Sequence, residues 1–152
     1  GDRERRWPGR AQGAPRVAAT FAAAGPASAG ATARDMRHRM LHLVNNSRHA
    51  HGLRPLRLSA PVSRYAWRHS RRMGRRGFIY HSSGVWSQVR RYGASTWGEN
   101  VGMSGTLVRL ERAFMASPSH RANTLASRFH RVGVGVFRAH GRLWVTLDFF
   151  GG

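Results

Sequence analysis

Two histidines and one glutamate stand in three short polar segments that lie far apart along the chain. His81 belongs to Tyr-His-Ser, Glu99 to Gly-Glu-Asn, and His120 to Ser-Pro-Ser-His-Arg-Ala-Asn. Only tertiary folding brings such segments together. Two imidazoles and a carboxylate can bind a divalent metal or move a proton. The sequence therefore predicts a polar site assembled from three parts of the chain.

Three interpretations of this cluster are open. A catalytic zinc site normally has three protein ligands, so Zn or another divalent metal would bind weakly unless Glu99 contacts it directly. The cluster could instead be a structural hydrogen-bond network. As a hydrolase site it would use a serine such as Ser82 or Ser117 beside a histidine. Neither Gly-x-Ser-x-Gly nor His-Glu-x-x-His occurs in the sequence, which favours binding over turnover.

Hydrophobic periodicity predicts three long helices, one short helix and at least three strands. Helix signals begin at Asp35, at Ser59 with Pro61 in the first turn, and near Thr106. The remaining predicted elements are a short helix over 85–92, an extended segment over 97–103, and a hairpin of 132–136 with 143–149 around Ala139-His140-Gly141. Pro118 is predicted to break the third long helix. This order indicates an α+β domain, with a small antiparallel sheet covered by helices on both sides.

Several motifs, in this order, resemble the bacterial branch of the CAP superfamily, which also contains the cysteine-rich secretory proteins, antigen 5 and plant pathogenesis-related proteins. The motifs are Leu43-Val44-Asn45-x-x-Arg48, Ala66-x-x-His69-Ser70-x-x-Met73, Phe78-x-x-His81-Ser82, Gly98-Glu99-Asn100-Val101 and Ser117-Pro118-Ser119-His120-Arg121-Ala122-Asn123. The resemblance covers roughly residues 36 to 150. It implies a three-layer α-β-α sandwich.

The resemblance also implies a cleft formed by His81, Glu99 and His120, in which the two histidines can hold a divalent metal. Ser117 falls near the position of a second glutamate in many eukaryotic members. Peptidase activity has been proposed within the family, but membership does not imply a shared reaction. If this protein is an enzyme, we expect it to be a hydrolase.

The composition suits one compact domain, which we place at residues 34–152. Residues 1–33 are expected to be either a secretory signal or a disordered Ala/Gly/Pro leader, because a basic stretch is followed by a short apolar one. No apolar run reaches the ~18 residues of a membrane-spanning helix. The chain has no cysteine, which favours the bacterial branch over a disulfide-rich eukaryotic one. We therefore expect a secreted, extracellular or envelope-associated protein.

All 26 basic residues are arginines, against six Asp and Glu, and residues 34–152 carry a net charge of +17. The densest group lies on the outer face of the second predicted helix: Arg68, Arg71, Arg72, Arg75 and Arg76. It is either a solvated face or an anion-binding surface, since arginine grips phosphates with two hydrogen bonds. The expected partners are anionic cell-envelope polymers or lipid head groups. Nucleic acid would bind only non-specifically, because no recognition motif is present.

Overall fold

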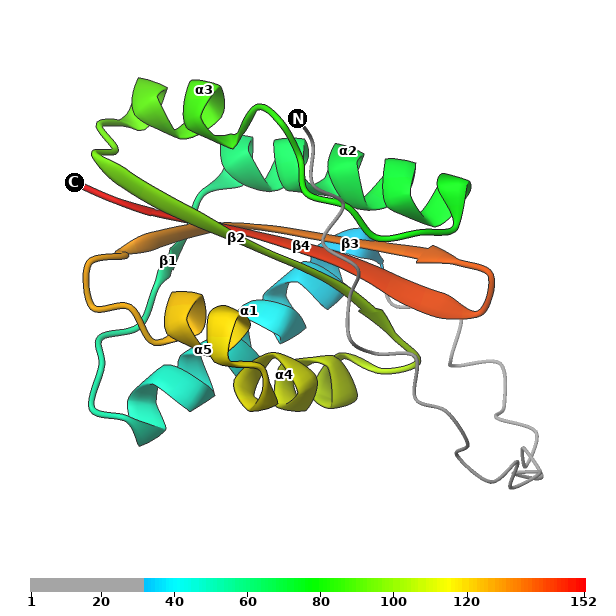
Figure 1. Ribbon diagram of the computed structural model, residues 1–152, viewed down its shortest axis with the longest axis horizontal. Helices are drawn as coiled ribbons and strands as arrows, with labels where there is room; N and C mark the ends of the chain where they lie inside the picture. The colour runs from blue at the N-terminus through cyan, green and yellow to red at the C-terminus, as the bar shows by residue number, and fades with distance from the viewer. Residues whose placement is uncertain (1–31) are drawn as a thin grey trace.

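The computed structural model describes residues 32–152, which form an α-β-α sandwich. Figure 1 views the sheet nearly edge-on, with α2 (Ala60–Arg76) and α3 (Val85–Val89) on one face. The helices α1 (Ala33–Ala50), α4 (Leu107–Ala116) and α5 (Pro118–Thr124) cover the other face. The predicted fold class is confirmed. The predicted leader lies almost entirely outside the described residues.

The sheet has four strands in the order β1-β3-β4-β2. They are β1 (Arg57–Leu58), β2 (Thr96–Ser104), β3 (Arg131–Ala139) and β4 (Arg142–Gly151). β4 pairs antiparallel with both β2 and β3, whereas β1 pairs parallel with β3. The sheet is therefore mixed, not purely antiparallel as predicted, because a two-residue strand too short to show alternation joins its edge.

Two of the three predicted long helices begin at the capping residue that the sequence indicated. Ser59 caps α2 and Gly77 ends it in the left-handed conformation at φ 78°. Thr106 caps α4, accepting a hydrogen bond from the Arg109 backbone at 3.2 Å. The predicted cap of α1 was wrong: Thr32 is the N-cap, and Asp35 is its capping-box partner three residues later.

Pro118 ends one helix and begins another. α4 stops at Ala116, and Pro118 occupies the first turn of α5, where its missing N–H costs no hydrogen bond. The predicted break is therefore correct, but the short helix after it was not foreseen. It carries His120.

The two faces of the sheet are buried differently. Val134, Leu147 and Phe149 belong to the main apolar core beneath α1 and α4. On the opposite face, Gly135 lets α2 approach so closely that a Cβ there would lie 2.3 Å from the backbone carbon of Ala66. α2 therefore packs directly on the sheet backbone.

Among residues 32–152, no helix is both long and apolar enough to cross a bilayer.

Arg48 anchors α1 to the loop that follows α5. Its side chain is 2% exposed, and its guanidinium donates hydrogen bonds to the carbonyls of Thr124 at 2.9 Å and Ala126 at 3.0 Å. It also reaches the carbonyls of Arg54 and Phe129. A buried charge is tolerated when its donors are satisfied in this way. The anchor fixes the position of α5 and hence of His120.

Candidate functional site

Glu99, in β2, holds His81 by a direct hydrogen bond. Glu99 Oε1 lies 2.9 Å from His81 Nδ1 and accepts a second hydrogen bond from the Ser82 backbone N–H at 2.8 Å. The Ser82 hydroxyl donates to Glu99 Oε2. The Glu99 side chain is 2% exposed, whereas that of His81 is 46% exposed. The carboxylate is thus an interior support for an imidazole that faces solvent.

The segment carrying His81 is positioned by α2. His69 Nε2 lies 2.6 Å from the carbonyl oxygen of Tyr80, and the His69 ring meets the Tyr80 ring edge-on. Three residues past His81, the Gly84 N–H donates to the Tyr65 hydroxyl at 2.9 Å. His69 is 1% exposed, so it supports this segment from the buried face of the helix.

Asp148 lies directly opposite Glu99 in the β2–β4 register, and sequence reasoning did not identify it. Its side chain is fully buried. Burial, and then the negative charge of Glu99, hold the pKa of Asp148 well above its usual value. Burial alone would also raise the pKa of Glu99, but interactions with His81, Asp148 and Ser82 outweigh it and lower that pKa. These opposite shifts favour a proton on Asp148 and the negative charge on Glu99, beside His81.

His120 lies in the first turns of α5, with Ser117 at the N-cap of that helix. The Ser117 hydroxyl lies 2.7 Å from His120 Nδ1. The His120 ring stacks on Phe114, with centroids 5.1 Å apart. Burial, and then the positive charge of His81, lower the pKa of His120 to about 4. The imidazole is therefore neutral at physiological pH.

Two asparagines, which sequence reasoning left without a role, join the two halves of the site. Asn100 Nδ2 donates to the carbonyl of His120 at 3.0 Å. Asn123 Nδ2 donates to Asn100 Oδ1 at 3.0 Å and to the carbonyl of Glu99 at 3.3 Å. These bonds fasten α5 to the edge strand β2. Asn100 belongs to the Gly-Glu-Asn-Val motif and Asn123 ends the Ser-Pro-Ser-His-Arg-Ala-Asn motif, so the motifs themselves could have pointed to both residues.

The arrangement consists of two supported imidazoles and not one triad. His81 is oriented by Glu99, and His120 has Ser117 at its Nδ1. Both oxygens of Glu99 accept hydrogen bonds, so direct metal ligation by Glu99 would require breaking them. No group of three or more His, Asp or Glu side chains within residues 32–152 is arranged to hold a metal ion. A divalent ion would therefore depend on the two imidazoles, with Glu99 as a supporting residue behind His81.

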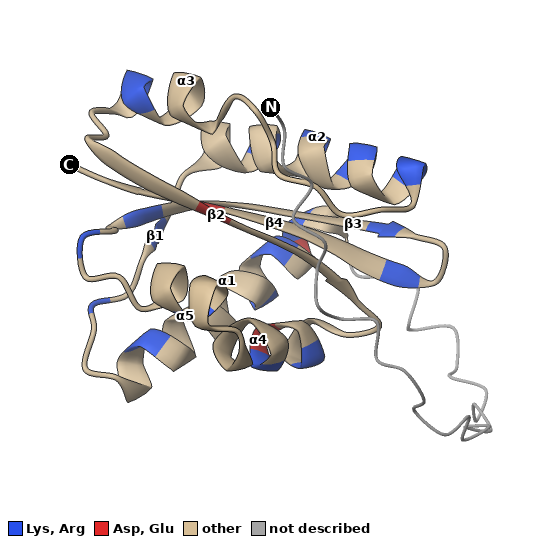
Figure 2. Ribbon diagram, in the orientation of Figure 1, with Lys and Arg blue, Asp and Glu red and all other residues tan. Residues whose placement is uncertain are grey.

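The five predicted anion-binding arginines lie along α2. Arg68, Arg72, Arg75 and Arg76 are exposed, and Arg71 is partly buried with its guanidinium 5.7 Å from the centre of the Trp67 ring. Figure 2 shows several basic positions along the outer side of this helix and very few acidic ones in the whole domain. The guanidinium of Arg76 also lies over the ring of Tyr80, 5.4 Å from its centre. The arginine surface therefore adjoins the segment that carries His81.

Comparison with known families and structures identifies the same kind of domain. Residues 41–149 match the model of the cysteine-rich secretory protein family, CAP. An uncharacterized protein of Bacillus subtilis, YkwD, is 30% identical over 120 residues, which is 74% of this chain and 46% of that protein. This chain thus spans less than half of that relative.

Solved structures show the same fold. An outer surface protein of Borrelia burgdorferi has a TM-score of 0.70 at 14% identity, over 80% of this chain and 96% of that one. A cysteine-rich secretory protein from Staphylococcus aureus has a TM-score of 0.67 at 20% identity, over 80% of this chain and 40% of that one. An extracellular Bacillus anthracis protein containing an SCP domain has a TM-score of 0.64 at 23% identity, over 82% and 45% respectively.

Proposed function

Since this chain belongs to the CAP family, we propose that it is a secreted bacterial binding module that attaches to anionic polymers or lipid head groups of the cell envelope. Two of the structural relatives are described as an outer surface protein and an extracellular protein. Their likeness to this chain extends to the fold alone. The choice of partner comes from the surface charge of this chain.

The near absence of exposed carboxylates carries this proposal. Residues 32–152 contain 21 arginines and four Asp or Glu residues. Glu99, Glu111 and Asp148 are buried, and the exposed Asp35 is hydrogen-bonded to Thr32 at the start of α1. Almost nothing on this surface therefore offsets the arginines. Such a field attracts polyanions and weakens as salt screens it.

The test measures binding of the full chain to poly(glycerol phosphate) and to phosphatidylglycerol vesicles over a series of salt concentrations. We expect binding at low salt that falls steeply as salt rises. The α2 variant Arg72→Gln/Arg75→Gln/Arg76→Gln is compared with Arg109→Gln/Arg112→Gln/Arg142→Gln, which removes the same charge from other elements. A stronger loss in the α2 variant supports the arginine surface as the contact. Absence of binding at low salt contradicts the proposal.

The cleft is proposed to bind a divalent metal weakly through His81 and His120. Such a metal would supply a positive charge to an anionic ligand. Neutral imidazoles are the species that donate to a metal, so affinity should fall as pH falls. Calorimetric titration with Zn²⁺ compares the full chain with His81→Ala/His120→Ala, and with His38→Ala/His42→Ala on the exposed side of α1 as a control. Loss of binding in the cleft variant alone is expected. Equal binding by all three proteins contradicts the metal role.

A metal-assisted hydrolase acting through the same cleft is the second candidate. The observation in its favour is the 2.7 Å contact between the Ser117 hydroxyl and His120 Nδ1, which pairs a nucleophile with a base. Against it, a pKa of about 4 makes His120 a weak base near neutral pH. Hydrolysis of p-nitrophenyl acetate, with and without Zn²⁺, is compared between the full chain, Ser117→Ala and His120→Ala. Turnover that both substitutions abolish in a folded protein would support this candidate, and unchanged turnover would remove it.

A further inference from the structure

Exposed aromatic residues gather at one end of the domain. Five large hydrophobic residues are exposed among residues 32–152, and three of them, Trp86, Tyr92 and Trp97, fall within one short stretch of the chain. Each of the three is between 39% and 45% exposed. Single exposed hydrophobic residues are common on proteins, whereas a group of them marks a contact surface. Together with Arg90 and Arg91, these residues form the aromatic end of the domain.

The sheet register brings the aromatic residues close together. Val85 and Val89 of α3 form a buried cluster with Phe150 of β4. Trp97 lies directly opposite Phe150 in the β2–β4 pairing, so both side chains point to the same face of the sheet, beside α3. The Ser95 N–H donates to a carbonyl oxygen at the end of β4 at 2.8 Å, which fixes the turn before β2. In Figure 1, α3 and the start of β2 lie at the same end of the molecule as the C-terminus.

The charged residues in this stretch of chain are all positive. Arg90 and Arg91 lie in the short 3-10 helix η2 (Arg90–Tyr92), directly after α3, and both are exposed. No Asp or Glu occurs from position 85 to position 98. Trp and Tyr favour the boundary between water and lipid, where the ring is buried and its polar atom stays hydrated. Arginine grips phosphate with two hydrogen bonds, so these neighbours fit lipid phosphates better than the neutral hydroxyls of a glycan.

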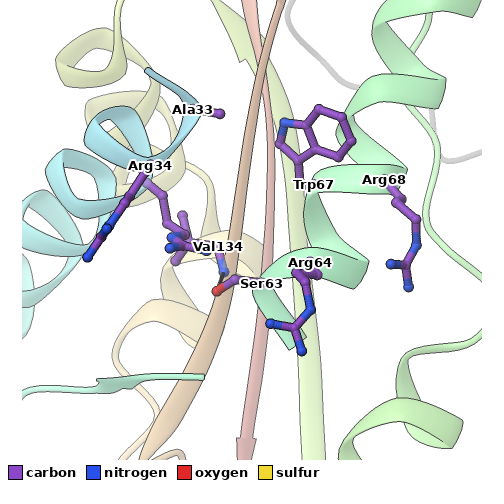
Figure 3. Close-up of a pocket in the computed structure, with 8 residues that line it drawn as sticks. Ala33, Arg34, Ser63, Arg64, Trp67, Arg68 and Val134 are labelled. Atoms are coloured by element: carbon purple, nitrogen blue, oxygen red, sulfur yellow. Dashed lines mark hydrogen bonds between the residues drawn. The ribbon is translucent and has the colours of Figure 1, made fainter. Parts of the chain in front are cut away.

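Trp67, in α2, is a contrasting aromatic residue beside arginines. It borders a groove of about 340 Å³ between α2 and the start of α1, and Figure 3 shows this groove with arginines of both helices at its sides. The Trp67 ring meets the Phe137 ring edge-on, with centroids 5.8 Å apart, and the Arg71 guanidinium lies over it. Trp67 is therefore partly buried within the domain, whereas Trp86 and Trp97 offer their rings to a partner.

We propose that the aromatic end docks on an anionic lipid surface. The rings of Trp86, Tyr92 and Trp97 enter the boundary between head groups and acyl chains, while Arg90 and Arg91 bind lipid phosphates. Burial of the rings and attraction of the arginines to the charged head groups both favour this placement. α2 covers the same face of the sheet as α3, so its arginines can face the same membrane. This inference rests on the proposed function, since it selects lipid over soluble polymer as the partner.

The test compares two polyanions, of which only one has an apolar interior. Binding of the full chain to phosphatidylglycerol vesicles and to soluble poly(glycerol phosphate) is measured at low salt, with and without Trp86→Gln/Trp97→Gln. We expect the variant to bind vesicles about tenfold or more weakly, and to bind the polymer within about threefold of the unsubstituted protein. Unchanged vesicle binding, or equal weakening toward both polyanions, overturns this inference and leaves the proposed function intact. Absence of binding to either polyanion contradicts the proposed function and overturns this inference as well.

A matched aromatic control and a depth measurement locate the contact. Phe78→Gln/Val108→Gln removes the other two exposed hydrophobic side chains and should weaken vesicle binding less than about threefold. Vesicles with brominated acyl chains should quench tryptophan fluorescence in the unsubstituted protein and much less in Trp86→Gln/Trp97→Gln. Equal weakening by the two double variants, or equal quenching, overturns the proposal. Loss of binding to peptidoglycan with unchanged vesicle binding would assign the aromatic end to a glycan, which also overturns it.

The two arginines of the aromatic end are tested separately. Arg90→Gln/Arg91→Gln should weaken vesicle binding about tenfold or more, because both charges lie near the lipid phosphates. Arg109→Gln/Arg112→Gln removes the same charge from exposed positions of α4, on the opposite face of the sheet, and should weaken binding less than about threefold. Equal weakening by both pairs means a diffuse charge effect and overturns the proposal.

Discussion

The sheet buries an apolar face beneath α1, α4 and α5 and a more polar face beneath α2. The first is built from aliphatic and aromatic side chains such as Val134, Leu147 and Phe149. The second combines glycines with buried polar groups, among them Ser70, whose hydroxyl meets that of Thr146 at 2.8 Å. Glu99 and Asp148 lie on this second face. Burial of apolar area on one face stabilises the fold, and the other face can therefore hold a buried ionised group beside His81.

The largest effect is expected on the apolar face. Phe149→Ala removes a fully buried ring that stacks on Phe129, and should lower the free energy of unfolding by about 3–5 kcal/mol. Guanidinium denaturation measures it. Phe78→Ala, at a ring that is 49% exposed, serves as the control and should cost less than about 1 kcal/mol. Similar losses in both variants would mean that this face does not dominate stability.

On the polar face, the close approach of the α2 backbone to the sheet should contribute more to stability than side-chain volume does. Gly135→Ala adds a methyl group that would lie 2.3 Å from the backbone of Ala66, so α2 must move away from the sheet. We expect a loss of about 2–3 kcal/mol. Gly105→Ala is the matched control, because a Cβ there meets nothing within 4 Å. An unchanged denaturation midpoint in Gly135→Ala would show that α2 does not depend on this glycine.

Glu111 is a buried carboxyl in the otherwise apolar layer, between α4 and α1. Burial raises the pKa of Glu111 to about 7, against the opposing effect of the Ser47 hydroxyl, which donates to it at 2.9 Å. The folded state therefore holds a proton that the unfolded state releases near pH 4.5. This contribution to stability is present at low pH and is lost as pH rises from about 4.5 through 7.

Glu111→Gln should remove that dependence. Relative to the unsubstituted protein, the variant should gain stability as pH rises from 5 to 8, by about 2 kcal/mol at the upper end. Denaturation at each pH gives the difference between the two proteins. A difference that does not change with pH would mean that Glu111 is already ionised in the folded state at pH 5.

The smallest effect is expected at Asp148. Because burial and the charge of Glu99 hold its pKa well above the usual value, this carboxyl favours its neutral form, and Asp148→Asn replaces a neutral carboxyl by a neutral amide of similar size. We expect a change in unfolding free energy of less than about 1 kcal/mol between pH 6 and 8. A loss of more than about 2 kcal/mol would show that the negative charge had been on Asp148.

The order of the motifs allowed the sandwich to be predicted, but not how the side chains of the candidate site pair. Sequence spacing cannot tell that His81 contacts Glu99 while His120 contacts Ser117. The polar face was also misjudged. If alternation in 143–149 meant that one face of the strand is exposed, Trp144 and Phe150 would form an exposed strip, yet they are 2% and 1% exposed. Alternation reveals the period of a strand, but a central strand is covered on both faces by helices distant in sequence. Asp148 was overlooked for the same reason.

The position of β4 determines when the site can form during synthesis. β4 is the last strand of the domain in sequence, but it lies between β3 and β2. Among residues 32–152, β2 has no other strand partner, so a nascent chain that ends at the β3–β4 turn leaves the strand carrying Glu99 unpaired. Pairing between distant strands is slow and needs both of them to be present. The sheet and the Glu99 side of the site are therefore completed together, once β4 is available to pair with β2.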